Sequence, residues 1–313
     1  MKTGPVATSE FLASSRSMVR TRAGLPVIGY GIFATVLFLA LLTATFPYAE
    51  TISSLLAPIG MKIVFERQAP NFPIGEELKN VQLISLADQR VLIQSPDVSI
   101  VPVMKRFLLG QLCLNVRAQI FGGMVDGMVR SRGQRGTILD FQLDALNLSR
   151  MGREASQAML GAQGRESEES DATFDWGEIL SGELSGRGSA QIIGSDLIAA
   201  RASLILLGRD IKTILANGLP PLELGMVAGR VLLEQGVATL QNVRAYGRYG
   251  DLTANGEIHL GADMASSTLQ LTLWLKPNAT ARASFGMLIN LLPHSPGAGP
   301  YYLEGSLKFP VVS

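Results

Sequence analysis

The feature that most constrains this chain is a stretch near its N-terminus that carries no charge. No Asp, Glu, Lys or Arg occurs from Ala23 to Ala49, and the densest apolar part is Val27–Phe46. A helix needs about 20 apolar residues to cross the roughly 30 Å hydrocarbon core of a bilayer, so the stretch is long enough to span it. We therefore predict a single transmembrane helix over residues 26–49.

The flanking charges predict the orientation of this helix. Residues 1–25 hold four basic residues and one acidic residue, so this basic tail is expected in the cytoplasm and everything after residue 49 on the outer side of the membrane. A cleaved signal peptide is the alternative. The apolar stretch exceeds the usual signal-peptide core of about 7–15 residues, and Pro47 and Tyr48 crowd the cleavage position, so a retained anchor is favoured.

Alternation of apolar and polar residues dominates the rest of the chain. In Leu112–Ile120 every second residue is apolar, and similar runs occur in Val227–Leu233, Val237–Tyr246 and Leu269–Leu275. A period of two predicts strands with one buried face and one wet face. We therefore predict a mainly β protein, a large curved antiparallel sheet with a few short helices.

A polar, acidic segment divides this β region. Residues 161–173 contain little apolar surface to offset the entropy of ordering, so we predict an exposed linker between a first half, residues 50–160, and a second half, residues 174–313. Glu166, Glu168, Glu169 and Asp171 could in principle bind calcium. Their spacing matches no calcium loop and lacks the turn glycine, so a solvated linker is favoured over a metal site.

Few segments have the pattern of an amphipathic helix. Glu50–Leu56 is expected to be helical, and Ser149–Leu160, Asp210–Ala216 and Ala281–Leu292 are the candidates for helices that cover the sheet. Three short helices would cover a long sheet incompletely. The apolar face could therefore be an ordinary core closed by the protein itself, or an open groove for an apolar ligand, and the sequence leaves both possibilities open.

A weak internal repeat places glycines within strands. Leu252–Leu260 resembles Tyr301–Phe309, and Gly182–Ala190 is a looser relative; the central glycines are Gly256, Gly305 and Gly186. Glycine within an alternating strand indicates a bulge, a bend or a close approach of another backbone. These positions therefore predict curvature.

The sequence contains no pattern of catalytic or metal-binding residues. His259 alternates with apolar neighbours and is expected on the wet face of a strand, and His294 lies in a turn. The single cysteine, Cys113, has no partner motif, and the carboxylates of Asp140 and Asp144 are a pair of a kind common in chains of this size. We therefore predict no enzyme activity, no cofactor and no metal. The balance of 27 basic and 26 acidic residues gives no case for nucleic acid.

The layout of the chain resembles one protein family. The residues that carry the likeness are the span ending in Leu41–Pro47, then Leu180–Gly186, and the closing strand Leu303–Pro310. They resemble the type II secretion system protein N family in its long, delta-proteobacterial form, over roughly residues 30–310. The glycine-containing strands are also similar to repeats of AsmA-like proteins, which are linked to lipid traffic between envelope membranes.

The resemblance implies two functions. The first is an accessory component of the type II protein secretion system, anchored in the bacterial inner membrane, with its C-terminal domain in the periplasm and other secretion-system membrane components as partners. The second is an AsmA-like periplasmic module that binds or transfers lipid through its acyl chains. The likeness implies no individual functional residues.

Overall fold

The computed structural model describes residues 33–34, 37–38, 41, 46–57, 60–71, 74–86, 89–107, 109–131, 136–160, 176–192, 200–214, 220–261, 267–306 and 310–313. The chain divides into two compact units, Met1–Phe46 and Pro47–Ser313. The predicted transmembrane helix lies largely outside the described residues, although Phe33, Leu37 and Leu41 are helical. Its predicted end at residue 49 is wrong, because Tyr48 and Ala49 begin a separate helix and are buried within the second unit. No helix of the described ranges is both long and apolar enough to cross a membrane.

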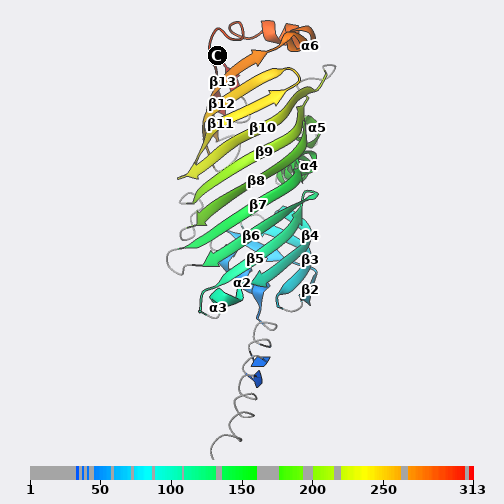
Figure 1. The fold of residues 1–313 in the computed structure, drawn as a ribbon, viewed down its shortest axis with the longest axis vertical. Coiled ribbons are helices and arrows are strands. Elements are labelled where there is room, and N and C mark those ends of the chain that lie inside the picture. The colour runs from blue at the N-terminus through cyan, green and yellow to red at the C-terminus, as the bar shows by residue number, and fades with distance from the viewer. Residues whose placement is uncertain are drawn as a thin grey trace, which may run out of the picture. The chain divides into compact units, whose positions relative to one another are not determined.

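The second unit is built on one antiparallel sheet of 15 strands (Figure 1). Its strands are β1 (Met61–Val64), β2 (Arg67–Pro70), β3 (Glu76–Ser85), β4 (Val91–Pro102), β5 (Cys113–Ile120), β6 (Gly123–Ser131), β7 (Thr137–Asn147), β8 (Leu180–Ile192), β9 (Arg201–Thr213), β10 (Leu222–Glu234), β11 (Val237–Gly247), β12 (Gly250–His259), β13 (Thr268–Pro277), β14 (Tyr301–Ser306) and β15 (Pro310–Val312). From β3 to β15 each strand pairs with the next one along the chain, while β1 and β2 share the free edge of β3.

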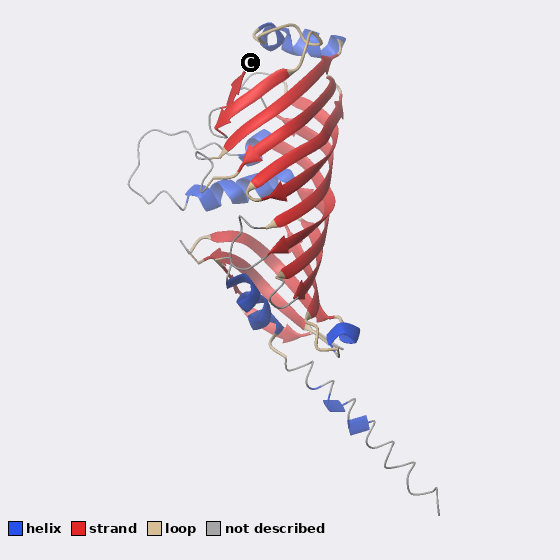
Figure 2. Ribbon diagram, turned by 90° about the vertical axis from the view of Figure 1, so that its left-hand side faces the viewer, coloured by secondary structure: helices blue, strands red, loops and turns tan. Residues whose placement is uncertain are grey.

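The helices are short, as predicted. They are α2 (Tyr48–Leu56), α3 (Met104–Phe107), α4 (Leu148–Leu160), α5 (Trp176–Ile179) and α6 (Ala279–Asn290). Figure 2 shows a curved sheet with α2, α4 and α5 on its inner side, and α6 at the end formed by the last strands. The sheet is continuous where the sequence predicted two halves, because β7 pairs with β8 on either side of the acidic segment. Residues 161–173 themselves lie outside the described residues.

Tight turns favour this strand-after-strand topology. Gln235 and Gly236 connect β10 to β11, and both have positive φ, 53° and 77°. Two-residue hairpin turns of this kind match the right-handed twist of the paired strands, and glycine adopts the conformation without strain. Consecutive strands therefore pair locally over most of the sheet.

Fully buried side chains gather at the two ends of the sheet. At the N-terminal end Tyr48 of α2, Leu78 of β3 and Ile100 of β4 are completely covered. At the C-terminal end Tyr249 and Phe285 meet edge to face with ring centroids 4.9 Å apart, and α6 packs there through Ala281 and Phe285. The main buried clusters thus close the ends of the sheet, and fewer positions are fully buried between them.

One predicted helix is wrong. The pattern of Asp210–Ala216 predicts a helix, but β9 continues to Thr213. Asp210 has a φ of 52°, and the register with β8 and β10 shifts close to this residue. The polar residues that interrupt the alternation therefore mark an irregularity in a long strand. Ser149–Leu160 and Ala281–Leu292 are helical as predicted, apart from the last two residues of the second segment.

Candidate apolar binding face

One face of the sheet is apolar along ten successive strands. Residues paired across antiparallel strands point to the same face, so the register defines rows. The central row is Val116, Gly127, Phe141, Gly188, Leu204, Val231, Leu240, Gly256, Leu271 and Leu303, one residue from each strand between β5 and β14. At about 4.8 Å per strand, this row is roughly 43 Å long.

The adjoining row on the same face has the same character. Its members are Leu114, Val129, Leu139, Ala190, Ala202, Leu233, Ala238, Ile258, Leu269 and Gly305. Neither row contains a charged or hydrogen-bonding side chain. We call these two rows the apolar face.

The apolar face lies on the side of the sheet that carries the helices. The backbone N–H of Ala49 in α2 donates to Oε2 of Glu76 at 3.1 Å. Glu76 pairs with Ile100, which pairs with Val116 of the central row, so α2 begins over the same face. Because α4 and α5 lie on the same side as α2 in Figure 2, the apolar face is the inner face of the curved sheet.

Glycines let this inner face curve. An ideal Cβ on Gly188 would lie 2.6 Å from the Ser203 carbonyl oxygen and 2.8 Å from Cζ of Phe141. On Gly256 it would lie 2.1 Å from the Gln270 carbonyl oxygen. Real Cβ atoms do not come this close, so only glycine permits the neighbouring backbone to approach. The close approach predicted for the repeat glycine Gly256 is confirmed.

The apolar face is incompletely covered over its length. Every member of the central row is half-buried, whereas Leu78, Ile100 and Leu114 at the N-terminal end are fully buried. A second layer of side chains packed over the whole central row would bury all of its members fully. No member of the central row is among the strongly exposed apolar side chains, so the strip is partly covered. Partial cover is compatible with an ordinary core and with an open groove, and the two alternatives are separated by experiment below.

The chemistry of this face suits aliphatic chains. It offers no charge, hydroxyl or amide to orient a polar ligand, and burial of apolar surface is non-directional. Each buried methylene contributes about 0.8 kcal/mol, so a long hydrocarbon gains affinity in proportion to the length it buries. An elongated apolar face without polar anchors therefore favours flexible hydrocarbon chains over a compact polar metabolite.

The opposite face of the sheet is polar from β4 to β8 and carries exposed apolar side chains, such as Ile205 and Trp274, further along. A neighbouring row consists of Ser99, Arg117, Asp126, Gln142 and Arg187. Arg117 and Asp126 form an ion pair of 2.6 Å, and Arg130 pairs with Asp140. A cleft of about 790 Å³ lies at this row from β4 to β8, and it is also lined by Val116, Gly127, Phe141 and Gly188 of the central row. The charges in the row compensate one another except for Arg187, so the cleft selects no strongly charged ligand.

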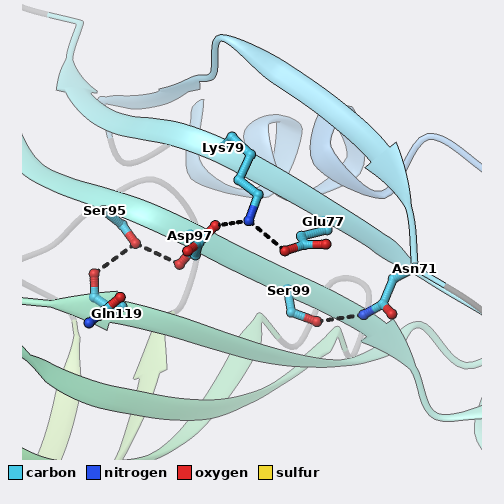
Figure 3. Close-up of polar contacts among 7 residues, drawn as sticks. All are labelled: Asn71, Glu77, Lys79, Ser95, Asp97, Ser99 and Gln119. Carbon is cyan, nitrogen blue, oxygen red and sulfur yellow. Dashed lines mark hydrogen bonds and ion pairs between the residues drawn. The ribbon is translucent and has the colours of Figure 1, made fainter.

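Figure 3 shows the polar contacts that join the first strands on this face. Nζ of Lys79 donates to Glu77 at 2.7 Å and to Asp97, and hydrogen bonds to Asp97 and then Glu77 raise the pKa of Lys79. Oγ of Ser95 lies 2.7 Å from the carbonyl oxygen of Asp97 and 2.9 Å from that of Gln119, and its one hydrogen is donated to either. These ion pairs are solvent-exposed and contribute little stability. The Lys79–Asp97 pair links β3 to β4, and the Ser95 hydroxyl links β4 to β5; these contacts form no reactive site.

Tyr48 gives a prediction for high pH. Its side chain is fully covered, and burial, followed by the negative charge of Glu76, raises its pKa to about 12. In the unfolded chain a tyrosine ionises near pH 10, so the folded state keeps its proton over a range in which the unfolded state loses it. The stabilising contribution is therefore complete below pH 10 and lost as the pH rises towards 12.

We expect the free energy of unfolding to fall by about 2 kcal/mol between pH 10 and 12, because each pKa unit corresponds to about 1.4 kcal/mol. Urea unfolding of the detergent-solubilised chain at several pH values measures this change in the free energy of unfolding. Tyr48→Phe should flatten the pH dependence, while Tyr246→Phe, at an exposed tyrosine, is the matched control. An unchanged pH dependence in Tyr48→Phe would show that this hydroxyl is not the responsible group.

The polar residues considered from the sequence do not form a site. His259 is exposed, as predicted, and lies 3.8 Å from Glu257. His294 stacks on Tyr301 with ring centroids 4.3 Å apart. Cys113 is buried, and Asp140 is paired with Arg130.

Metal ligands are not clustered in the part of the chain that the structure describes, which contains no group of three or more His, Cys, Asp or Glu able to hold a metal ion. The acidic residues Glu166, Glu168, Glu169 and Asp171 lie outside that part.

The candidate site is therefore the apolar face. Alternation within single strands indicated it, but only the register shows that the rows are continuous.

Comparison with known proteins adds no relative. No protein-family model, no curated protein and no solved structure matches this chain. The functional argument therefore rests on the geometry of the sheet and on the sequence patterns.

Proposed function

We propose that this protein is a membrane-anchored envelope protein that holds lipid acyl chains along its apolar face. The observation that carries the proposal is the central row, which is apolar and half-buried on ten successive strands. A closed core would give full burial, and a surface open to water would carry polar residues. The role is binding or transfer of lipid, with no chemical step and no cofactor.

The proposal includes the membrane anchor. We propose that the part of residues 26–49 that precedes α2 spans the bacterial inner membrane once, with residues 1–25 in the cytoplasm and the sheet in the periplasm. The uncharged stretch and the basic flank support this orientation. A reporter enzyme that works only after export, fused behind Ser313, should be active. Recovery of a mature chain that begins near Glu50 would contradict the anchor.

Lipid content tests the proposal directly. The full chain, purified in detergent and exchanged into a lipid-free amphipol, should retain phospholipid that mass spectrometry detects at one or more molecules per protein. A phospholipid with a photoreactive group in its acyl chain should then label peptides of the apolar face, such as those with Leu204 and Leu240, and leave Arg187 and Gln142 of the polar face unlabelled. Absence of retained lipid, or labelling of both faces alike, would contradict the proposal.

A role in type II secretion is the second proposal. It is supported by the sequence resemblance and by the polar cleft, in which the side chains of Asn115, Gln142 and Arg187 have no hydrogen-bond or ion-pair partner within the described ranges. Open polar groups of this kind can pair with a protein partner. Cross-linkers placed at these three positions in native membranes should capture secretion-system membrane components. If cross-linkers on the apolar inner face give the same result as cross-linkers on this face, a contact through this face is contradicted.

A further inference from the structure

A short basic and apolar projection stands at the N-terminal end of the sheet. It consists of α3 (Met104–Phe107) and of Leu109 and Gly110 beyond it; Leu108 between them lies outside the described residues. Lys105 and Arg106 are exposed without an ion-pair partner among the described residues, and Leu109 is 71% exposed. The stretch contains no acidic residue.

The backbone holds this projection in a defined shape. The N–H of Arg106 donates to the carbonyl oxygen of Val103 at 2.9 Å, and the carbonyl oxygen of Arg106 accepts from the N–H groups of Leu109 and Gln111 at 3.1 and 3.0 Å. Leu109 thus bonds back to α3 through its backbone while its side chain is exposed. A large apolar side chain fixed in this way beside two free cations has the composition of a membrane-surface contact.

The projection lies close to the point where the chain enters the sheet unit. Ala49 at the start of α2 donates to Glu76, and Glu76 pairs with Ile100 in β4. Met104 is four positions after Ile100. Four positions span at most about 14 Å and paired strands are about 5 Å apart, so α3 begins within roughly 20 Å of the backbone of Glu76, whose carboxylate accepts from the start of α2. Figures 1 and 2 both show α2 and α3 at the same end of the sheet.

We propose that residues 104–110 are a second membrane contact, in which Lys105 and Arg106 bind anionic phospholipid headgroups and Leu109 inserts at the boundary of the acyl chains. The inference rests on the proposed membrane anchor, because the predicted span leads directly into α2, which begins at Tyr48. An anchored chain keeps the projection within reach of the bilayer surface, so a contact of low affinity is sufficient to hold these residues at the membrane. The contact would hold the first strands of the apolar face against the lipid from which acyl chains are taken.

A fluorescent probe on the full chain tests this contact. In a Cys113→Ala background, Leu109→Cys carries an environment-sensitive dye, and the protein is reconstituted in nanodiscs of phosphatidylcholine with or without phosphatidylglycerol. Discs with phosphatidylglycerol should shift the emission to the blue and allow several-fold stronger quenching by nitroxide groups on the lipid chains. Leu291→Cys in the loop after α6, at a residue that is 75% exposed, is the matched control and should stay water-exposed in both discs.

Charge reversal distinguishes contact with anionic lipid from contact with a protein. Each cation near an anionic surface favours contact by a factor of about five, so the Lys105→Glu/Arg106→Glu pair should reduce the lipid-contacting population about tenfold or more. A blue shift without quenching by lipid nitroxides would overturn the proposal in favour of a protein or a second copy. A water-exposed probe in chains that co-elute with discs would overturn it while leaving the anchor intact. Chains that elute without discs would overturn the anchor and this inference together. Lipid retained on the apolar face is measured in a separate experiment, so that proposal is tested independently of this contact.

Discussion

Leu271→Asp is expected to leave the sheet folded and to remove the lipid that co-purifies with the protein. Leu271 is a half-buried member of the central row, paired with Gly256 and Leu303. A carboxylate there keeps contact with water in the free protein, so folding loses only the strand propensity of about 1 kcal/mol. An acyl chain lying over the same position would have to strip water from that charge, which is far more costly.

Leu114→Asp should behave in the opposite way. Leu114 lies in the adjoining row but is 0% exposed, between Pro102 and Val129. A carboxylate at this position is buried without a partner and costs several kcal/mol, a large part of a total stability of about 5–15 kcal/mol. We expect this variant to be recovered unfolded or degraded.

Thr272→Asp is the matched control for Leu271→Asp. Thr272 is the next residue along β13, points to the polar face, and pairs with Asn255 and Tyr302. It introduces the same charge into the same strand and should keep both fold and lipid. Circular dichroism reports folding and mass spectrometry reports lipid. If Leu271→Asp unfolds like Leu114→Asp, the central row is core and the lipid proposal fails; if it folds and keeps its lipid, the acyl chains bind elsewhere.

Gly256→Ala is expected to lower the free energy of unfolding by about 3 kcal/mol or more. The φ of Gly256 is 148°, outside the range of other residues, and the added Cβ would lie 2.1 Å from the carbonyl oxygen of Gln270 and 2.7 Å from Cα of Leu271. Both atoms belong to the backbone of β13, so no side-chain rotation relieves the overlap. The strands β12 and β13 would have to separate where they bend.

Gly286→Ala provides the comparison. Gly286 lies in α6, and nothing lies within 4 Å of the position of an added Cβ. Alanine favours a helix over glycine by up to about 1 kcal/mol, so this variant should be slightly more stable than the parent chain. Urea unfolding of the detergent-solubilised proteins measures both changes. Equal midpoints for Gly256→Ala and the parent would show that this glycine does not set the curvature.

Local patterns in the sequence were sufficient for the β class and for most helices. The alternation in Leu112–Ile120 and Leu269–Leu275 corresponds to β5 and β13, and Ser149–Leu160 corresponds to α4. These are local properties, since the period of side chains along a strand or helix is fixed by its backbone geometry. The helix predicted for Asp210–Ala216 was wrong because polar residues at an irregularity in a strand look like the polar side of a short helix. Pairing with β8 and β10 decides that this segment belongs to a strand.

The sequence by itself determined that this chain forms amphipathic strands joined by tight turns, with glycines where strands bend. It did not determine which residues of different strands line up, because a shift of one residue in register reverses the face of every side chain in a strand. Only the tertiary structure aligns Val116, Leu204 and Leu271 in one row over ten strands. Coverage is likewise a tertiary property: Leu114 and Leu271 have the same alternating pattern, yet the first is fully buried and the second is half-buried.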